Sequence, residues 1–480
     1  MTSTLDSPVA AEASAAGARR MPGWRVLALV AAVGHVLVTS GPIIDLDVYW
    51  HTLVGEYTLK GKGFPHPDPF AYTLPDVHWH STAWLSELVL AATYDAAGFV
   101  GIVALRLLLA LLLLAALYRV LVSGTTGWQG PVVFTIVALP ITGYVQERPQ
   151  TVSLIFCCWL AACCRDTLVK GQLPSRWRFV AITYVWALFH ALFVLAPFCL
   201  GLLAVGAVLD GGRARLGQAR QLLLTAAVTT IACALTPMGP RLLLAPVTVG
   251  NAAKDYIAEW APTQISSFGA WGLLGVLGLA IAAWARQTNA TRSVLLWTLS
   301  LSVIGFMAGR NAAPAAILLA PIACEQAQRA WPSVSSLRVP RRPVIALTAF
   351  GLLAAAATYL GKPVLPTSSP TRIAAHLHDQ PGTVRVFTDY NLSGYLLREA
   401  WPHVRVEIDG RADRYGGGLL RDYSKAVNGE ASWQAFVKRM DPDVAVLGTT
   451  SPLSQLLIQA GWTVTIRDHN WLLLTPPART

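Results

Sequence analysis

Long apolar segments separated by short polar loops fill the first three quarters of the 480-residue chain. Most of them approach twenty residues, the length that an α-helix needs to cross a bilayer core of about 30 Å. The pattern predicts about eleven membrane-spanning helices, at residues 24–43, 98–120, 131–145, 150–168, 179–190, 191–209, 220–237, 268–285, 293–309, 312–328 and 343–361. Because 179–190 and 191–209 are short, one long kinked helix with a re-entrant turn is an alternative for that pair.

The pattern changes near residue 363, where short apolar runs begin to alternate with helical stretches. Five runs are predicted to form strands: 384–387, 404–408, 444–447, 463–466 and 471–474. Helices are predicted between them, at 392–400, 415–427, 432–439 and 453–460. Such alternation is typical of a small α/β unit. We therefore predict three parts: a disordered cytoplasmic segment 1–23, a transmembrane module 24–362 and an α/β domain 363–480.

Composition supports the membrane assignment. Hydrophobic residues make up 54% of the chain, charged residues make up 13%, and the mean hydropathy is +0.49. A soluble protein carries about a quarter charged residues, so these values predict an α-helical polytopic membrane protein. The seven cysteines lie in apolar segments without the spacing of a metal site or a disulfide framework. They are predicted to act as small hydrophobic residues.

The net charge of +11 follows membrane topology rather than nucleic-acid binding. Basic residues concentrate in alternate loops, which predicts that these loops and the N-terminus face the cytoplasm. The predicted inner loops hold Arg119, Arg165, Lys170, Arg176, Arg178, Arg213, Arg215, Arg220, Arg286, Arg292, Arg329, Arg338, Arg341 and Arg342. Anionic membrane lipids are the partners that this distribution favours. Eleven helices then place the C-terminal domain outside the cell.

The longest polar interval in this part of the chain, 44–97, directly follows the first predicted helix. It begins with Asp45 and Asp47 and continues through His78, His80 and Glu87. Polar residues also collect in or beside the other predicted outer loops: Glu147, Arg148, His190, Arg241, Glu259, Trp260 and Arg310. Because the inner loops are merely basic, an active or binding site is predicted at the outer face.

Each of these residues also has a purely structural explanation. An Asp or Arg at a helix end is often a solvated cap or a side chain that reaches to the interface. Trp260 fits the aromatic belt of a membrane protein, and a neighbouring helix can satisfy His190. His78 and His80 alternate as on a strand. Together with Asp45 and Asp47 they form an alternative site for a divalent metal, the one cofactor that the sequence leaves open.

Several short motifs resemble, in order, those of bacterial multi-span glycosyltransferases of the GT-C superfamily. In the first polar interval they are Asp45-Leu-Asp-Val-Tyr-Trp-His51, Phe64-Pro-His-Pro-Asp-Pro-Phe70 and Trp84-Leu-Ser-Glu87. The later motifs are Glu147-Arg-Pro-Gln150, Trp186 to His190, Pro237-Met-Gly239, Glu259-Trp260, Gly309-Arg-Asn311, Val386-Phe-Thr-Asp-Tyr390, Gly394-Tyr-Leu396 and Asp409-Gly-Arg411. The resemblance, to protein mannosyltransferase-like and arabinofuranosyltransferase-like enzymes, spans nearly the whole chain.

The resemblance implies an inverting glycosyltransferase of a bacterial plasma membrane, whose donor is a polyprenyl-phosphate-linked sugar at the outer leaflet. The acceptor would be a glycan, lipid or protein of the cell envelope. Asp45 or Asp47 would take the proton of the acceptor hydroxyl, or bind a metal. Arg148, Arg241 and Arg310, with His190 as a further donor, would bind the departing phosphate, because guanidinium groups hold phosphate oxygens bidentately.

Asp409 and Arg411 follow a predicted strand of the outer domain, and Glu259 and Trp260 lie in a predicted outer loop. These residues either bind the acceptor or dock the domain onto the outer loops, and for Arg411 we favour docking. Two other classes of protein stay open. A non-catalytic GT-C-like scaffold would keep the fold without transferring a sugar. A transporter would carry intramembrane charge pairs, and the predicted spans show almost none apart from Arg106.

Overall fold

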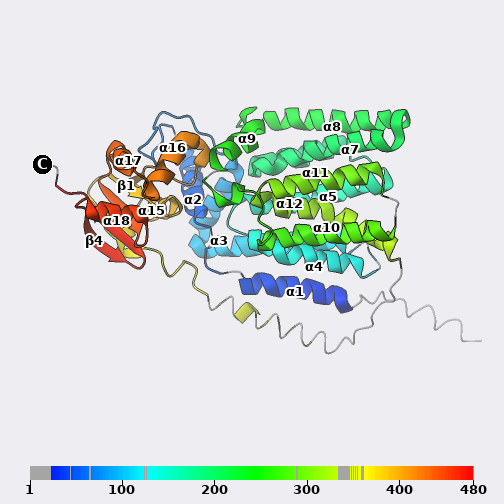
Figure 1. The fold of residues 1–480 in the computed structure, drawn as a ribbon, viewed down its shortest axis with the longest axis horizontal. Coiled ribbons are helices and arrows are strands. Elements are labelled where there is room, and N and C mark those ends of the chain that lie inside the picture. Colours follow the sequence, from blue (N-terminus) through cyan, green and yellow to red (C-terminus); the bar gives the residue numbers. More distant parts are fainter. Residues whose placement is uncertain are drawn as a thin grey trace, which may run out of the picture.

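The computed structural model describes residues 23–478 except 40, 44, 64, 65, 124, 126, 255, 288, 289, 333–345 and eight positions between 347 and 361. Nearly all of the predicted N-terminal segment 1–23 and much of the predicted span 343–361 lie outside the described residues. Figure 1 shows two parts along the long axis of the molecule: a bundle of roughly parallel helices, and a sheet with helices at one end of that bundle.

The bundle is formed by apolar helices whose axes run side by side in Figure 1. They are α1 (Gly23–Thr39), α3 (Trp84–Leu121), α4 (Gln129–Ile141), α5 (Pro149–Lys170), α6 (Arg176–Phe189), α7 (Leu195–Gly211), α8 (Leu216–Ala234), α10 (Phe268–Arg286), α11 (Arg292–Met307) and α12 (Ala312–Ala330). Helix α12 is buried along almost its whole length and packs against α4, α5, α10 and α11. Its many alanines allow this, because small residues let apolar helices approach closely.

Four helical runs in the described chain are long and apolar enough to cross a membrane: Trp84–Leu121, Pro149–Lys170, Ala191–Ala234 and Phe268–Arg286. The run Ala191–Ala234 contains both α7 and α8, which pack against each other. Arg25–Thr39, Gln129–Tyr144 and Arg292–Met307 are shorter apolar helices. The total of about eleven spans stays a prediction.

Several elements differ from the sequence prediction, and helices at Asp47–Tyr57 and Thr371–His378 lie where none was predicted. Helix α3 begins at Trp84, well before residue 98, and non-helical angles at Ala97 and Gly98 divide it into two parts. Helices α6 and α7 are separate, because His190 is extended and a 3-10 turn, η4 (Ala191–Val194), follows it. The alternative of one kinked helix is therefore wrong. Helix α9 (Arg241–Ala253) lies in a stretch that we predicted to be an outer loop.

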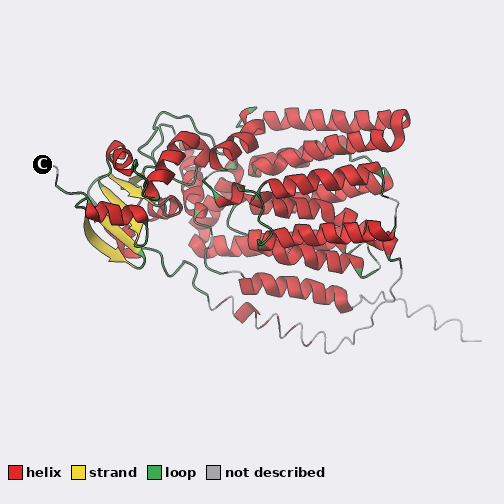
Figure 2. Ribbon diagram, in the orientation of Figure 1, coloured by secondary structure: helices red, strands yellow, loops and turns green. Residues whose placement is uncertain are grey.

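The strands lie where the apolar runs predicted them. They are β1 (Val384–Thr388), β2 (Val404–Val406), β3 (Val444–Gly448), β4 (Thr463–Asp468) and β5 (Trp471–Thr475). Their order is β2-β1-β3-β5-β4; β2, β1 and β3 are parallel, and β5 is antiparallel to β3 and β4. The helices of this region are α14 (Thr371–His378), α15 (Tyr390–Ala400), α16 (Ala412–Val427), α17 (Trp433–Met440) and α18 (Pro452–Gln459). Figure 2 shows the strands gathered beyond the end of the bundle.

The first polar interval fills the space between bundle and sheet. It contains helix α2 (Asp47–Tyr57) and a π-helical turn, η2 (Thr58–Lys62). Helix α2 is buried from Val48 to Gly55. The ring of Tyr49 lies edge-on to Phe99 of the bundle at 5.1 Å and to Tyr395 of the sheet region at 5.2 Å. Helix α2 therefore joins the two parts into one hydrophobic core.

The same interval also covers the edge strand β2. Ala71 pairs in parallel with Val406: the Tyr72 amide donates to the Val406 carbonyl at 3.0 Å, and the Val406 amide donates to the Phe70 carbonyl at 3.0 Å. An uncovered strand edge would leave backbone groups unpaired. Residues 70–72 satisfy this edge and hold the sheet close to the polar residues of the interval.

Candidate functional site

One guanidinium, that of Arg148, binds three carboxylates at the sheet end of the bundle. It forms ion pairs with Asp45, with Asp47 at 2.9 Å and with Glu259 at 2.7 Å. The carboxylates come from the first polar interval and from the turn η6 (Ala258–Trp260). A guanidinium suits this role, because its five N–H groups point in fixed directions within one plane. The outer-face residues predicted from separate loops are thus joined in one cluster.

The local sequence positions Arg148 at the start of α5. Pro149 is the first residue of α5, and Arg148 before it is extended, with φ −114° and ψ 151°. A residue that precedes proline is driven to this conformation by steric contact with the proline ring. Glu147 is buried beside it, forms an ion pair with Arg106 and accepts a hydrogen bond from the Asp45 amide at 3.3 Å. Glu147 thus connects Arg106 of α3 to the backbone at Asp45, which follows α1. Buried charges are stable when they are paired in this way.

The two predicted catalytic acids occupy different positions. Asp45 is 5% exposed, and its Oδ1 accepts the Asp47 amide at 2.9 Å. The Asp47 side chain is 29% exposed, and its Oδ1 accepts a hydrogen bond from Trp50 Nε1 at 3.0 Å. Burial and the neighbouring Asp47 carboxylate raise the pKa of Asp45 from 3.8 to about 6, although Arg148 acts in the opposite direction. Asp45 is therefore the buried acid of the cluster, and Asp47 is the more exposed one.

A cavity of about 180 Å³, here called the central cavity, lies in front of Asp47 and Arg148. Its walls come from the bundle, the first polar interval and the sheet region. It is lined by Asp47, Trp50, His51, Trp79, Ser81, Thr82, Ala83, Arg148, Pro149, Gln150, His190, Val249, Ile257, Glu259, Trp260, Arg310, Tyr390, Asn391, Gly410, Arg411, Ala412 and Asp413. The cavity brings together most of the predicted site residues.

The hydrogen bonds of His190 indicate which ring nitrogen carries its hydrogen. Nδ1 accepts the Leu192 amide at 3.3 Å and lies 2.9 Å from Ser153 Oγ. The Ser153 oxygen in turn accepts a hydrogen bond from Trp186 Nε1 at 2.7 Å, which leaves the hydroxyl hydrogen to point at His190. Nδ1 is thus an acceptor, and in a neutral imidazole the hydrogen is then on Nε2. His190 lines the central cavity and can offer it a hydrogen-bond donor.

Arg310 lies beside Glu259 because two turns touch. The turn η7 (Gly309–Asn311) approaches η6 through a hydrogen bond from the Gly309 amide to the Ala261 carbonyl at 2.9 Å. Arg310 Nη1 is then 3.4 Å from Glu259 Oε1, and its guanidinium carbon lies 4.3 Å from the ring centre of Trp260. Burial and the like charge of Arg148 lower the pKa of Arg310, while Glu259 raises it.

From the sequence, His51 and Glu87 were expected only as polar residues of the first interval, and neither was predicted to have a role in the site. His51 lines the central cavity, and its Nδ1 lies 3.1 Å from Glu87 Oε1. A carboxylate can only accept hydrogen bonds, so Nδ1 carries the hydrogen and Nε2 is left as the basic nitrogen. Ser81 Oγ donates to the same Glu87 oxygen at 2.6 Å. A signal was present, because His51 comes four residues after Asp47 and so lies on the same face of α2.

Two groups of predicted residues are not brought into the cluster. Arg241 begins α9, is exposed and does not line the central cavity. The predicted metal ligands are also separated by their contacts: His78 stacks on His66 at 3.6 Å, whereas Asp45 and Asp47 bind Arg148. The described part of the chain holds no group of three or more His, Cys, Asp or Glu side chains placed to bind a metal. The four residues do not fit a metal site, and we derive no step through a metal.

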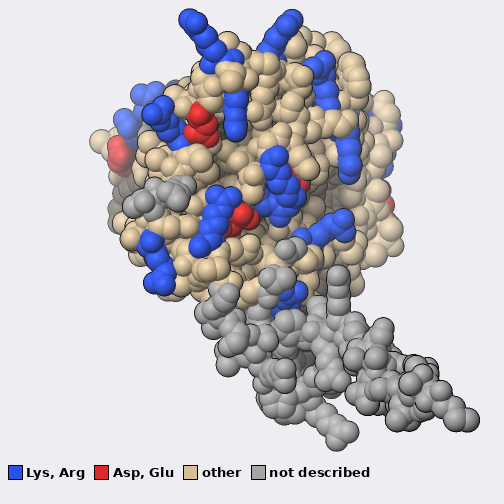
Figure 3. Space-filling view, turned by 90° about the vertical axis from the view of Figure 1, so that its right-hand side faces the viewer, with Lys and Arg blue, Asp and Glu red and all other residues tan. Residues whose placement is uncertain are grey.

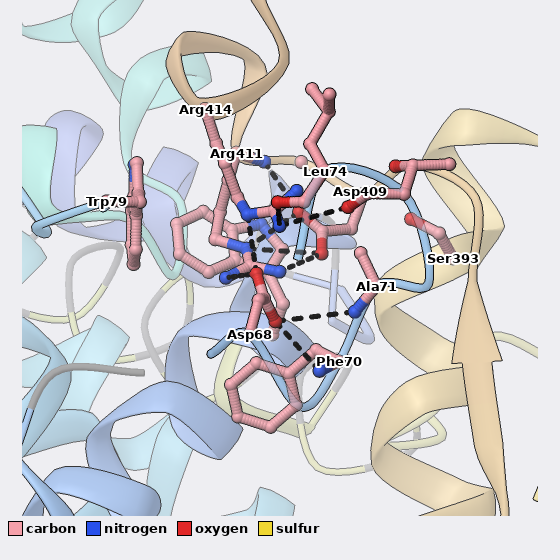
Figure 4. A network of polar contacts seen from close by, with 12 residues as sticks. Asp68, Phe70, Ala71, Leu74, Trp79, Ser393, Asp409, Arg411 and Arg414 are labelled. Carbon is pink, nitrogen blue, oxygen red and sulfur yellow. Dashed lines mark hydrogen bonds and ion pairs between the residues drawn. The ribbon is translucent and has the colours of Figure 1, made fainter. Parts of the chain in front are cut away.

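Asp409 and Arg411 belong to a buried network that joins the sheet region to the first polar interval (Figure 4). Arg411 is 1% exposed and binds Asp68 at 2.8 Å and Asp409 at 2.6 Å. Asp68 Oδ1 accepts the amides of Phe70 and Ala71, and Arg414 also binds Asp68. Burial acts to raise the pKa of Asp409, but the charge and hydrogen bonds of Arg411 outweigh it, and the pKa lies below its ordinary value.

Two glycines of the sheet region pack directly on the start of α2. A Cβ atom at Gly394 would lie 3.0 Å from the Leu46 carbonyl oxygen. A Cβ atom at Gly410 would lie 2.2 Å from Trp50 Nε1 and 2.4 Å from Asp47 Oδ1. Both distances at Gly410 are far inside van der Waals contact. The motif Asp409-Gly-Arg411 therefore holds Arg411 in the network and leaves room for Asp47.

Two further cavities adjoin the cluster from different sides, and Arg148 lines both. The apolar cavity, of about 210 Å³, is lined by Ser86, Val89, Leu90, Ile102, Leu105, Arg106, Leu109, Gln146, Glu147, Arg148, Pro149, Val152 and Phe189. The polar cavity, of about 460 Å³, is lined by Arg148, Tyr256, Ile257, Ala258, Glu259, Asp389, Tyr390, Asn391, Leu420, Tyr423, Ser424, Val427 and Asn428. An apolar and a polar compartment thus meet at one guanidinium.

No protein-family model matches the sequence, and no curated protein matches it in a sequence comparison. Solved structures do resemble it. The apo crystal structure of ArnT from Cupriavidus metallidurans is 14% identical, with a TM-score of 0.50 over 95% of this chain and 98% of that chain. The same protein bound to undecaprenyl phosphate gives 15% identity and a TM-score of 0.48 over 96% and 99%.

The cryo-EM structure of the arabinofuranosyltransferase AftD from mycobacteria is 12% identical, with a TM-score of 0.49 over 95% of this chain and 40% of that chain. At these identities the likeness concerns the fold, and the match to apo ArnT extends over nearly the whole of both chains. The sequence resemblance predicted this outcome, and the prediction is confirmed: the chain has a GT-C-like fold.

Proposed function

We propose that the chain is a membrane glycosyltransferase that moves a sugar from a polyprenyl-phosphate-linked donor to a cell-envelope acceptor at the outer leaflet. The observation that carries the proposal is the position of Arg148: it is held by Asp45, Asp47 and Glu259 where the apolar and polar cavities meet the central one. A transferase that joins a lipid-linked sugar to a hydroxyl needs such a junction. The GT-C-like fold supports the same function.

The apolar cavity is the proposed entry for the polyprenyl chain. Val89, Leu90, Ile102, Leu105 and Leu109 give it hydrocarbon walls, and Arg148 lines both this cavity and the central one. A lipid tail seated there would bring its phosphate to the central cavity, where Arg148, Arg310 and His190 Nε2–H converge. Arg310 is the stronger candidate for the phosphate ligand, because among the described residues it forms one ion pair, with Glu259, whereas Arg148 is shared by three carboxylates.

The polar cavity is the proposed entry for the acceptor. Its wall carries Asp389, Asn391, Ser424 and Asn428, which can exchange hydrogen bonds with hydroxyl groups. Three tyrosines, Tyr256, Tyr390 and Tyr423, add flat faces suited to a sugar ring. An acceptor in this cavity would approach the anomeric carbon from a different side than the departing phosphate. That arrangement suits a single displacement with inversion.

In the proposed step, the acceptor oxygen forms a bond to the anomeric carbon while the bond from that carbon to the phosphate oxygen breaks. The electron pair of the broken bond leaves with the polyprenyl phosphate, and the acceptor proton passes to a carboxylate. Asp47 is the proposed base, because it lines the central cavity and Asp45 does not. Asp45 would instead position Arg148. A general base must lie within hydrogen-bond reach of the proton it takes.

His51 is the rival base, because Glu87 orients its Nδ1–H and leaves Nε2 available at the same cavity. The two bases are separated by turnover measurements on Asp47→Asn and His51→Gln. Loss of general-base help typically lowers the rate by 10²–10⁴-fold. We expect Asp47→Asn to show that loss, and His51→Gln to show a smaller one.

The function is tested with the full chain in lipid nanodiscs. Short-chain polyprenyl phosphates carrying different sugars serve as donors, an envelope extract serves as acceptor, and release of polyprenyl phosphate is measured. Asp422→Asn, a change in an exposed ion pair with Arg439, is the matched control and should retain wild-type turnover. If the double variant Asp47→Asn/His51→Gln restores normal envelope glycans in a deletion strain, the chain acts without either base, as a scaffold would, and the proposal fails.

A further inference from the structure

A second large cavity lies far from the central cavity, toward the end of the bundle that points away from the sheet. It has a volume of about 620 Å³ and lies between α3, α5 and α6. We call it the basic cavity. Its rim residue Arg165 lies about 24 Å along α5 from Pro149, given a rise of about 1.5 Å per residue. Nothing in the proposed transfer reaction uses this cavity.

Three arginines from three helices form the rim. Arg119 comes from the last turn of α3, Arg165 from α5 and Arg178 from the first turn of α6. The carboxylate at the rim, Asp166, is already bound by Arg165 at 2.9 Å and by Lys170 at 3.0 Å. Figure 3 shows that this end of the molecule carries many Lys and Arg side chains and few acidic ones. The rim therefore has an excess of positive charge.

Two of the rim arginines are available to a ligand. Arg119 and Arg178 are exposed, and neither makes a hydrogen bond or an ion pair with another residue that the structure describes. Arg165 is only partly available to a ligand, because it binds Asp166 and also donates to the Val120 carbonyl at 3.2 Å. Two guanidinium groups on different helices, without a partner among the described residues, suit an anion with several oxygens.

The interior of the basic cavity is apolar. Ile155, Trp159 and Ala162 of α5 and Phe179 of α6 line it, and the Trp159 and Phe179 rings lie 5.0 Å apart. Ile155 lies about 15 Å along α5 from Arg165. A free anion would contact only the arginines at the rim, whereas an apolar cavity of this depth suits a hydrocarbon chain.

We propose that the basic cavity binds an anionic phospholipid of the bilayer, with its phosphate at Arg119, Arg165 and Arg178 and an acyl chain along Ile155, Trp159 and Phe179. Basic pockets between membrane helices are known to bind phosphate headgroups, and each Lys or Arg near an anionic lipid surface changes binding by a factor of about five. The bound lipid joins α3, α5 and α6 at the end opposite to the catalytic cluster, and it does so whether or not sugar transfer occurs.

Cys163 supplies a local readout, because it lines the basic cavity and is the partly exposed cysteine, whereas the other six are buried. The full chain in dodecyl maltoside is mixed with phosphatidylglycerol or with phosphatidylcholine of the same chain length. The rate of maleimide labelling at Cys163 is then measured, and native mass spectrometry counts the retained lipid. Phosphatidylglycerol should slow the labelling at lower concentration than phosphatidylcholine does.

The double variant Arg119→Gln/Arg178→Gln should weaken the apparent affinity for phosphatidylglycerol about 25-fold, the product of two factors of about five. The matched control, Arg213→Gln/Arg215→Gln, removes two exposed arginines in the turn η5 (Gly212–Arg215) between α7 and α8, outside the cavity. It should keep wild-type affinity. Equal protection by both lipids, or equal loss in both double variants, overturns the proposal. Protection by inorganic phosphate alone identifies a simple anion site and also overturns it.

Discussion

Gly410 of the sheet region lies directly against Asp47 of the first polar interval. A single added carbon at Gly410 would come within 2.4 Å of Asp47 Oδ1. The acid that faces the central cavity is therefore positioned from two sides. Arg148 binds its Oδ2, and the backbone at Gly410 limits the space beside its Oδ1. This contact makes the sheet region part of the site rather than an appendage to the bundle.

Gly410→Ala is expected to lower turnover about 10²-fold while the protein remains folded. The new methyl group must displace Asp47 or Trp50, and a misplacement of about 1 Å at a reacting group can cost about that much in rate. Steady-state transfer rates measure the effect. Gly418→Ala in α16 is the control, because a Cβ atom there meets nothing within 4 Å. Equal turnover in the two variants would show that Asp47 need not be held in place.

The raised pKa of Asp45 predicts how stability varies with pH. In the folded protein the pKa is about 6, against an ordinary value of 3.8, so the folded state binds this proton more tightly than the unfolded state. The stabilisation from protonated Asp45 is fully present below about pH 4 and is lost as the pH rises through about 6. A difference of about 2 pKa units corresponds to roughly 3 kcal/mol.

Thermal unfolding of wild type and Asp45→Asn at pH 4 and pH 7.5 checks this expectation. The wild type should lose more stability than the variant between the two pH values, because Asn cannot ionise. The same ionisation should appear in turnover as an acid limb near pH 6, since ionised Asp45 is needed to hold Arg148. An unchanged acid limb in Asp45→Asn would assign the limb to another group.

Most of the helices and strands were predictable because each buries an apolar face of its own, whereas α2 and α14 lie in stretches where no helix was predicted. The apolar runs that became β1 and β3 carry short β-branched stretches, and α5 begins at a proline that favours the first turn of a helix. Helix α9 was missed because a search for membrane spans passes over Arg241–Ala253, which is too short to cross a bilayer. Arg241 was accordingly predicted to bind phosphate, although it is exposed at the start of that helix.

The pairings inside the site were less predictable, because they join residues that are distant in the sequence. Nothing near Asp68 in the sequence indicates Arg411, and nothing near His51 indicates Glu87. Such pairs arise when the first polar interval folds between bundle and sheet, and periodicity carries no information on that packing. From the charge bias of the loops, we predicted only that these residues share the outer face. That bias does not indicate that their side chains meet at Arg148.

Cysteine labelling tests the predicted orientation, with the N-terminus inside and the sheet region outside. New cysteines at Asp76 and Glu430, both exposed, should react with an impermeant maleimide on intact cells, in a background with Cys163→Ala. A cysteine at Ser175, exposed at the opposite end of the bundle, should react only after permeabilisation. External reaction at Ser175 would reverse the topology. Ser81 is unsuitable for a label because it is 2% exposed.

Arg411→Ala is expected to loosen the contact between the sheet region and the first polar interval. The change leaves Asp68 and Asp409 buried with one cation fewer, and removal of one partner of a buried ion pair typically costs about 3–5 kcal/mol. It also removes a guanidinium that lies 5.4 Å from the ring centre of Phe70 and 5.1 Å from that of Trp79. Limited proteolysis should release fragments of residues 363–478, and the apparent affinities for donor and acceptor should both fall.

The control for that prediction is Arg439→Ala, which breaks an exposed pair with Asp422. Exposed pairs typically contribute about 0–1 kcal/mol, so this variant should keep its protease resistance and both affinities. A different result separates docking from acceptor binding. If Arg411→Ala raised the acceptor KM alone, with donor affinity and protease resistance unchanged, Arg411 would contact the acceptor. Its 1% exposure and its two carboxylate partners argue for docking.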